Sequence, residues 1–123
     1  MPTVELTKEN FSRTLEDHDI VLVDFWASWC GPCRMFSPIY ERVAERHPDV
    51  VFGKVDTEAQ QELAGSFNIM SIPTLMIFRD NIALFAQPGM LPEAALEDLL
   101  RQTRELDMDE VRAKVAEQQA AQA

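Results

Sequence analysis

The two cysteines of the chain lie three positions apart, in the run Trp29-Cys30-Gly31-Pro32-Cys33. Residues 20–26 before it are mostly apolar and predict a buried strand, and residues 35–46 after it have the amphipathic pattern of a helix. The cysteines therefore lie at a strand-to-helix turn, with Cys30 at the helix N-terminus. Backbone N–H groups and the positive end of the helix dipole favour a thiolate there. Because the thiolate is the nucleophile of disulfide chemistry, this run is a candidate redox centre.

Length and charge restrict the classes of protein to consider. The 123 residues suffice for one domain, and the 46% hydrophobic and 26% charged content is that of a soluble globular protein. A net charge of −10 without a basic stripe argues against nucleic acid and anionic membrane surfaces as partners. Residues 1–6 lack the basic start and long apolar region of a secretory signal, which predicts a cytoplasmic protein. Permanent structural disulfides are rare in that compartment.

The apolar patterns predict an α/β fold. Strands are expected over residues 3–6, 20–26, 50–55, 74–78 and 82–86, and helices over 7–17, 35–46, a short stretch after Thr57, and 93–104. Thr7 and Thr57 are the expected N-caps, and His18 is expected on the inward face of the first helix. Alternating strands and helices imply parallel pairing, whereas the turn Asp80-Asn81 implies an antiparallel hairpin. The result is a mixed central sheet of about five strands with helices on both faces.

Residues 107–123 extend beyond these elements. Asp107 and Glu110 fit a capping box, which predicts an extra helix with Met108, Val111 and Val115 on a narrow apolar stripe. A continuation of the preceding helix into one long helix is the alternative, because no glycine or proline lies between residues 93 and 119. The polar end, residues 118–123, is expected to fray.

Several segments resemble one known family. Residues 24–34, with the sequence Asp-Phe-Trp-Ala-Ser-Trp-Cys-Gly-Pro-Cys-Arg, resemble the active-site segment of the thioredoxin family. Residues 72–74 (Ile-Pro-Thr) resemble its cis-proline loop, residues 54–56 (Lys-Val-Asp) its lysine-bearing strand, and Gly89 falls at its third substrate-facing loop. The resemblance implies a thioredoxin-like fold for a domain of residues 1–106 and says nothing of the 107–123 extension.

Three positions depart from the usual pattern of the family. Arg34 follows the second cysteine where many relatives have lysine, Ser71 precedes the Ile-Pro pair where glycine is frequent, and the hairpin has Asp80-Asn81 in place of Asn-Gly. These differences bear on substrate preference more than on the chemistry.

The reaction that the resemblance implies is reduction of protein disulfides. Cys30 would attack a target disulfide as a thiolate, and Cys33 would then attack the Cys30 sulfur and release the reduced target. The spacing is expected to leave Cys30 toward solvent and Cys33 inward. Gly31 and Pro32 would tune the redox balance, although Pro32 is equally a proline at a helix start.

Asp24 interrupts an apolar strand, where burial is expected to raise the pKa of its carboxyl group. The resemblance implies a buried aspartate beneath Cys33 that exchanges protons with it through water. Lys54 would lie near this aspartate and temper its charge. The alternatives are a structural aspartate bonded to the backbone and an ordinary exposed lysine on a strand.

An apolar rim around Cys30 is also expected from the resemblance. It would bind an extended segment of the target beside Ile72, as in strand addition. The proline of the Ile-Pro pair is expected to be cis. Core packing is the alternative interpretation for Trp29 and Met70. The residues of the predicted rim are Trp29, Met70, Ile72, Pro73 and Gly89.

The resemblance further implies a monomer without a bound cofactor or metal. Electrons would come from NADPH through a flavoprotein thioredoxin reductase and pass to targets such as ribonucleotide reductase, peroxiredoxin and methionine sulfoxide reductase. A zinc site is a different interpretation of the cysteines, but it would require His18 and His47 to converge on them. Two other interpretations are an oxidase or isomerase of exported proteins, and a non-redox binding or chaperone-like module that uses the apolar rim.

Overall fold

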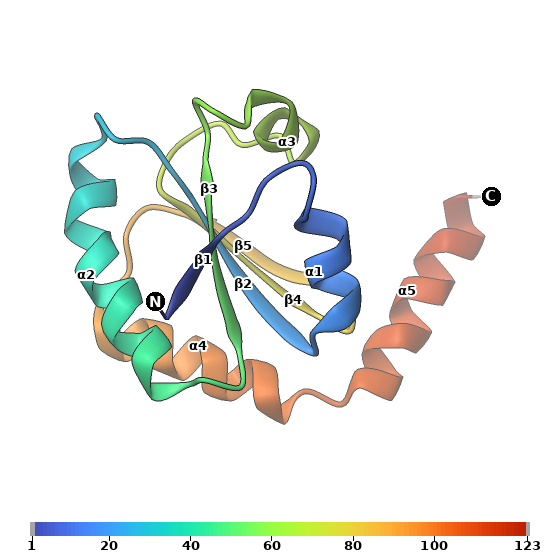
Figure 1. The fold of residues 1–123 in the computed structure, drawn as a ribbon. Coiled ribbons are helices and arrows are strands. Elements are labelled where there is room, and N and C mark those ends of the chain that lie inside the picture. Colours follow the sequence, from blue (N-terminus) through green and yellow to red (C-terminus); the bar gives the residue numbers. More distant parts are fainter. Residues whose placement is uncertain (1, 123) are drawn as a thin grey trace. The chain divides into compact units, whose positions relative to one another are not determined.

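The computed structural model describes residues 2–122; Met1 and Ala123, the ends of the two predicted segments, lie outside them. Five strands and five helices occur in the described residues (Figure 1). In chain order they are β1 (Thr3–Glu5), α1 (Phe11–Asp17), β2 (Ile20–Trp26), α2 (Gly31–Arg46), β3 (Val51–Asp56), α3 (Gln61–Ser66), β4 (Thr74–Arg79), β5 (Ile82–Pro88), α4 (Glu93–Glu105) and α5 (Met108–Gln122).

Residues 2–93 form one compact unit, which contains a five-stranded sheet of order β1-β3-β2-β4-β5. β3 pairs in parallel with β1 and with β2, whereas β4 runs antiparallel to β2 and to β5. The predicted mixed sheet is therefore confirmed. Because β2 is the central strand and ends just before the cysteine run, the two thiols are held at the end of the most buried strand.

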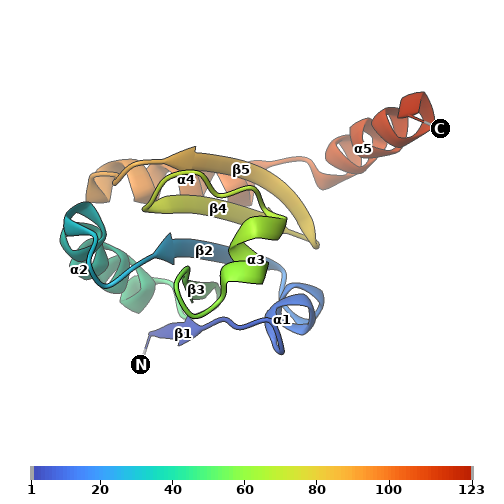
Figure 2. The same ribbon diagram turned by 90° about the horizontal axis from the view of Figure 1, so that it is seen from above.

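The two faces of the sheet carry different helices, as Figure 2 shows for α2 on one side and for α1 and α3 on the other. Alternation along β2 places Val21, Val23 and Phe25 in a buried cluster with Phe11 of α1 and Ala64 of α3. The intervening positions, 22, 24 and 26, consequently face α2. This alternation directs the side chain of residue 24 toward the helix that carries Cys33.

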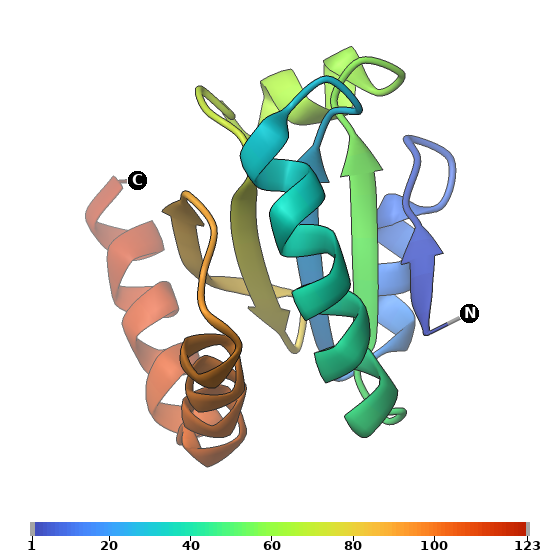
Figure 3. The same ribbon diagram turned by 90° about the vertical axis from the view of Figure 1, so that its left-hand side faces the viewer.

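Figure 3 shows α2 lying over one face of the sheet, and a buried tyrosine of this helix fixes it there. The hydroxyl of Tyr40 donates a hydrogen bond of 2.8 Å to the carbonyl oxygen of Gly53 on β3. Gly53 has no room for a side chain, because a Cβ atom there would overlap the side chain of Leu6 and lie 3.3 Å from the carbonyl oxygen of Leu22. Close packing at this point therefore requires glycine.

The hairpin between β4 and β5 forms as the sequence predicts. Asp80 and Asn81 both have positive φ, 53° and 63°, which is the backbone conformation of a tight two-residue turn. The register of the two strands shifts between Ile77 and Phe78, so β5 contains an irregularity that the alternation did not indicate.

Both predicted threonine caps are wrong: the N-caps of α1 and α3 are Asn10 and Gln60, and neither side chain makes a capping hydrogen bond. α1 begins only at Phe11, and Asn10 accepts a hydrogen bond of 2.7 Å from the Thr7 backbone N–H. Thr57 instead donates both its N–H and its hydroxyl to the carbonyl oxygen of Trp26, at 2.9 and 3.0 Å. His18 is exposed rather than inward, since α1 ends at Asp17.

Residues 94–122 form the second unit and contain most of α4 and all of α5. The two helices are separate: Asp107 lies between them, and its carboxylate accepts the backbone N–H groups of Asp109 and Glu110 at 3.0 and 3.2 Å. Two orphan N–H groups of α5 are thereby satisfied. The extra helix is confirmed, and the alternative of one long helix is wrong. No helix within residues 2–122 is long and apolar enough to cross a membrane.

Candidate active site

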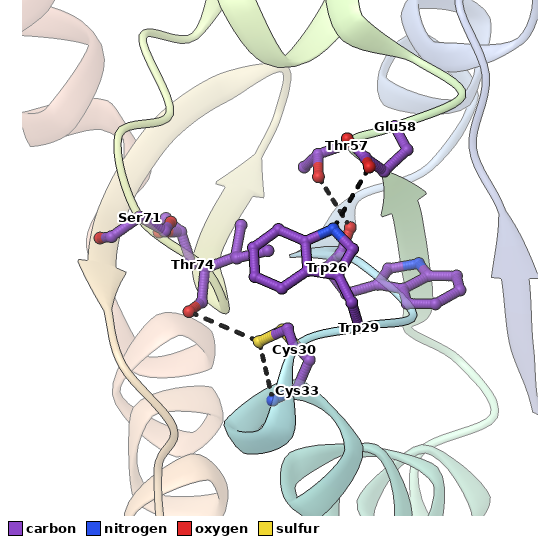
Figure 4. The surroundings of a disulfide bond; sticks show 9 residues. Trp26, Trp29, Cys30, Cys33, Thr57, Glu58, Ser71 and Thr74 are labelled. Carbon is purple, nitrogen blue, oxygen red and sulfur yellow. Dashed lines mark hydrogen bonds between the residues drawn. A yellow bond between two sulfur atoms is a disulfide. The ribbon is translucent and has the colours of Figure 1, made fainter.

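Cys30 and Cys33 are joined by a disulfide at the N-terminal end of α2, with Cα atoms 5.2 Å apart (Figure 4). Cys30 is the N-cap of the helix, and its Sγ accepts the backbone N–H of Cys33 at 3.2 Å. Gly31 and Pro32 are the first two helical residues. Proline is tolerated there because a backbone N–H in the first turn has no acceptor within the helix. A thiolate at position 30 would receive the same N–H and the field of the helix dipole.

The expectation that Cys33 lies inward agrees with the structure, whereas the expectation that Cys30 is left toward solvent is wrong, because both residues are buried. Cys30 is 4% exposed and Cys33 3% exposed. Trp26 and Ile72 pack against the pair, and the Cys30 Sγ lies 3.7 Å from the carbonyl oxygen of Ile72. The N-cap position thus places the Cys30 sulfur beside the Cys33 backbone N–H and the Ile72 carbonyl oxygen.

The loop before β4 contains Ile72 and Pro73 and lies against the disulfide through Ile72. The peptide bond between Ile72 and Pro73 is cis, as the sequence resemblance predicts. Gly89 has a φ of +94°, and its N–H donates a hydrogen bond of 2.8 Å to the carbonyl oxygen of Pro73. Pro73 itself is buried, whereas Gly89 is exposed. The backbones of two predicted rim residues, Pro73 and Gly89, are therefore hydrogen-bonded to each other.

Three other rim residues, Trp29, Met70 and Ile72, line one hollow of about 360 Å³, and Ile72 also packs against the cysteine pair. The Trp29 and Met70 side chains are 65% and 86% exposed, so neither serves as core packing. The indole N–H of Trp29 donates a hydrogen bond of 3.2 Å to the carboxylate of Glu58 (Figure 4). An anchored aromatic ring beside the cysteines gives the hollow a fixed wall.

Asp24 is 1% exposed, and its two carboxylate oxygens receive no hydrogen bond from the residues that the structure describes. Burial raises the pKa of this carboxyl group from about 3.8 to about 7, against the opposing positive charge of Lys54. The negative charge of Asp24 in turn contributes to the raised pKa of Tyr40 on α2. Asp24 therefore lies on the same face of the sheet as the helix that carries Cys33, within electrostatic range of it.

Lys54 is the register partner of Asp24 on the neighbouring strand. Its ammonium group donates a hydrogen bond of 3.1 Å to the hydroxyl of Ser37 and lies 5.1 Å from the centre of the Trp26 ring. An ordinary exposed lysine would make neither contact. The cation–π contact and the hydrogen bond hold the Lys54 ammonium group within electrostatic range of the Asp24 carboxylate, although the two groups are not hydrogen-bonded to each other.

The geometry does not assemble the zinc site considered above. Within residues 2–122, no three histidine, cysteine, aspartate or glutamate side chains are placed to hold a metal ion. His18 bonds instead to the carbonyl oxygen of Thr14, at 3.0 Å, and His47 stacks on Phe52.

Comparison with known proteins decides between the remaining interpretations. The family model described as Thioredoxin matches residues 2–102 of the chain. This chain belongs to the thioredoxin family. It is 69% identical over 118 residues to the putative thioredoxin 2 of Streptomyces coelicolor, in an alignment that covers 96% of this chain and 88% of that protein. Such coverage includes most of the residues that follow Leu106.

Solved structures share the fold. A mutant thioredoxin of Halobacterium salinarum NRC-1 superposes with a TM-score of 0.79 at 33% identity, over 86% of this chain and 95% of that one. A chain from a study of the thiol-resolving mechanism of yeast mitochondrial 1-Cys peroxiredoxin through glutathione and thioredoxin systems gives a TM-score of 0.75 at 27% identity. That match covers 81% of this chain and 94% of the other.

This thioredoxin is accordingly a thiol-disulfide oxidoreductase of the disulfide-reductase type, and Cys30–Cys33 is its redox-active pair. Sequence reasoning missed two residues that shape the site, Glu58 and Ser37. Glu58 belongs to a polar turn whose position beside Trp29 depends on the pairing of β2 with β3. Ser37 lies on α2 one turn after Cys33, a spacing that could have marked it as a neighbour of the sheet.

Proposed function

We propose that this thioredoxin reduces protein disulfides in the cytoplasm, with Cys30 as the attacking thiolate and Cys33 as the resolving thiol. The observation that carries these roles is the N-cap geometry, in which the Cys33 N–H lies 3.2 Å from the Cys30 Sγ. A hydrogen bond to the charged form and the N-terminal end of a 16-residue helix both favour the thiolate at position 30. Cys33 lies inside the first turn and is the donor of this bond.

Two exchange steps move two electrons from the chain to its target. The Cys30 thiolate forms a bond to one sulfur of the target disulfide, the target S–S bond breaks, and the other target sulfur leaves as a thiolate that takes up a proton. Cys33 then loses its proton and attacks the Cys30 Sγ. The mixed disulfide breaks, the second target sulfur leaves, and the Cys30–Cys33 disulfide forms. The structure holds this product, with the two Cα atoms 5.2 Å apart.

Asp24 is the proposed acceptor of the Cys33 proton. Its carboxyl group has a pKa of about 7, so at neutral pH it can exchange protons in either direction. Lys54 keeps the pKa from rising further, because its ammonium group is held beside the carboxylate by Ser37 and Trp26. An exchange of this kind runs through water, since no side chain among residues 2–122 bonds to Asp24.

The target binds at the rim around the disulfide. Trp29, Met70 and Ile72 supply apolar surface, and the cis loop at Pro73, bonded to Gly89, presents backbone groups to an extended segment of the target. Gly31 and Pro32 tune the potential, because one hydrogen bond more or fewer at the thiolate shifts it measurably.

The electron donor is a flavoprotein thioredoxin reductase that uses NADPH, and this thioredoxin acts as a monomer without a bound cofactor. Enzymes of the peroxiredoxin, ribonucleotide reductase and methionine sulfoxide reductase types are its targets; the peroxiredoxin and thioredoxin systems named for one structural neighbour support the first of these. We regard residues 107–123 as an extension of a thioredoxin domain that spans residues 1–106.

Reduction of insulin tests the proposal. Wild-type chain recycled by dithiothreitol, and then by NADPH with thioredoxin reductase, should accelerate the precipitation of insulin B chains. Cys30→Ser should abolish this activity. Absence of turnover by the wild-type chain would contradict the proposed function, and reduction of insulin that survives Cys30→Ser would contradict the assignment of Cys30 as the attacking thiolate.

A further inference from the structure

Two hollows flank the exposed segment that precedes the cis-proline, and one of them is lined by Ile72, which packs against the disulfide. The first is the hollow of about 360 Å³ that contains Trp29 and Ile72. The second, of about 220 Å³, lies against β4 and β5 and is lined by Thr74, Met76 and Ala86. Ile69, Met70 and Ser71 line both. Of these three shared residues, Met70 has the large hydrophobic side chain that is 86% exposed.

Neither hollow is lined by a charged residue, although 26% of the chain is charged. The polar groups of the second hollow are the neutral side chains of Asn68, Ser71 and Thr74. Two of its walls are buried, since Met76 is 7% and Thr74 6% exposed. A charged side chain that entered this space would lose hydration without gaining an ionic partner, whereas an apolar side chain would bury its surface.

The size of the second hollow restricts its occupant. Sites for small-molecule ligands occupy about 300–1,000 Å³, so a hollow of about 220 Å³ suits an amino-acid side chain better than a free ligand. The second hollow shares residues 69–71 with the first hollow. The first hollow is in turn lined by Ile72, whose carbonyl oxygen lies 3.7 Å from the Cys30 Sγ. The two hollows thus adjoin along residues 69–71, so a target segment bound beside Ile72 lies next to the second hollow.

We propose that the second hollow binds an uncharged, apolar side chain of the oxidised target protein, close in sequence to the target's reacting cysteine, and that Met70 is the adaptable lining residue that admits it. This inference rests on the proposed function. A methionine side chain has three rotatable bonds and a polarizable sulfur, so it can adjust to side chains of different shape. The chain would thus select targets by what flanks their disulfide.

Two alanines of β5 provide a matched test. Ala86 is exposed and lines the second hollow, whereas Ala83 is exposed on the same strand and lines neither hollow. Ala86→Glu should raise the KM for insulin roughly 5- to 10-fold, with kcat and the rate with 5,5′-dithiobis(2-nitrobenzoate) unchanged, because that small disulfide has no flanking chain. Ala83→Glu, with the same change in net charge, should match the wild type.

Disulfide-bonded peptides with leucine or glutamate at each position beside the cysteine pair give the second measurement. At one or more of these positions, the wild-type chain should have a lower KM for the peptide with leucine than for the peptide with glutamate. Ala86→Lys should reverse this preference at the same positions. Equal KM values for the two peptide series with the wild-type chain would overturn the inference even if the Ala86 variants failed to fold. So would equal effects of Ala86→Glu and Ala83→Glu. Either result would leave wild-type turnover of insulin, and hence the proposed function, intact.

Discussion

Asp24 and Lys54 are direct register partners on adjacent parallel strands, yet they are not hydrogen-bonded to each other. The ammonium group of Lys54 donates to Ser37, and the carboxylate of Asp24 is buried without a hydrogen-bond partner among residues 2–122. A lysine that bonded this carboxylate directly would favour its charged form strongly and lower its pKa. The separation instead leaves the pKa of Asp24 at about 7, where a proton can be gained or lost at neutral pH.

The unpaired carboxylate should reduce stability. Asp24→Asn should increase the free energy of unfolding above pH 7 by on the order of 2–4 kcal/mol, since the pKa is raised by about 3 units from its ordinary value and each unit corresponds to about 1.4 kcal/mol. Because the folded-state pKa lies above the unfolded-state value, the contribution of Asp24 to stability is present below about pH 4 and is lost as the pH rises through about 7. Urea unfolding across this range measures the difference.

Asp98→Asn is the matched control for that substitution. The pKa of Asp98 is lowered by hydrogen bonds from Arg101 and Gln102 at an exposed site, so its replacement should not stabilise the chain at any pH. A gain for Asp24→Asn that was the same at pH 4 and pH 8 would contradict the assignment of a raised pKa.

Proton transfer from Cys33 should depend on the same carboxylate. The rate at which the mixed disulfide resolves should rise through about pH 7 in the wild-type chain, as Asp24 loses its proton. Asp24→Asn should slow this step at least about tenfold, which is below the usual general-base effects of about 10²–10⁴-fold, and should remove that inflection. Rapid mixing of reduced chain with insulin measures the step. An unchanged profile in the variant would assign the base elsewhere.

The bond between Trp29 and Glu58 should matter for target binding. Glu58→Ala removes the acceptor of the indole N–H, so the ring loses one fixed orientation beside the disulfide. We expect a rise of roughly 2- to 5-fold in the KM for insulin with kcat unchanged, as for loss of one exposed hydrogen bond. Glu62→Ala, which removes an exposed glutamate paired with Lys8 instead, serves as the control. Equal KM values for the two variants would exclude this role.

A pair of glycines tests the packing beneath the site. Gly53→Ala should destabilise the chain by about 1–3 kcal/mol, because the new Cβ atom would overlap Leu6. Gly65 lies in α3, and a Cβ atom added there would have no neighbour within 4 Å. Gly65→Ala should therefore stabilise the chain by about 0.5–1 kcal/mol. Guanidinium unfolding of both variants gives the comparison, and similar effects of the two would contradict the packing described for β3.

The sequence predicted the fold where local chemistry decided the structure. Asp80 and Asn81 tolerate positive φ, so their turn and the hairpin around it could be predicted from residue type alone. Helix starts failed where tertiary contacts override local preference: Thr57 bonds to Trp26, a residue 31 positions away, instead of capping α3. A cap inferred from sequence cannot take such a distant partner into account.

The site was predicted as a set of residues rather than as a geometry. Trp29, Met70 and Ile72 do line one hollow, but the burial of Cys30 was missed because it depends on Ile72, 42 positions along the chain. The contact of Trp29 with Glu58 was missed for the same reason. Pairwise contacts across the sheet end follow from strand register, which no single segment specifies.

Trapping of the mixed disulfide tests the assigned cysteine roles most directly. Cys33→Ser, reduced and mixed with oxidised insulin, should accumulate a covalent adduct through position 30, because the resolving thiol is missing. Cys30→Ser should accumulate none under the same conditions. Non-reducing electrophoresis and mass spectrometry of the linked peptides would identify the sulfur involved. An adduct formed by Cys30→Ser through position 33, with none formed by Cys33→Ser, would contradict the assignment of Cys30 as the attacking thiolate.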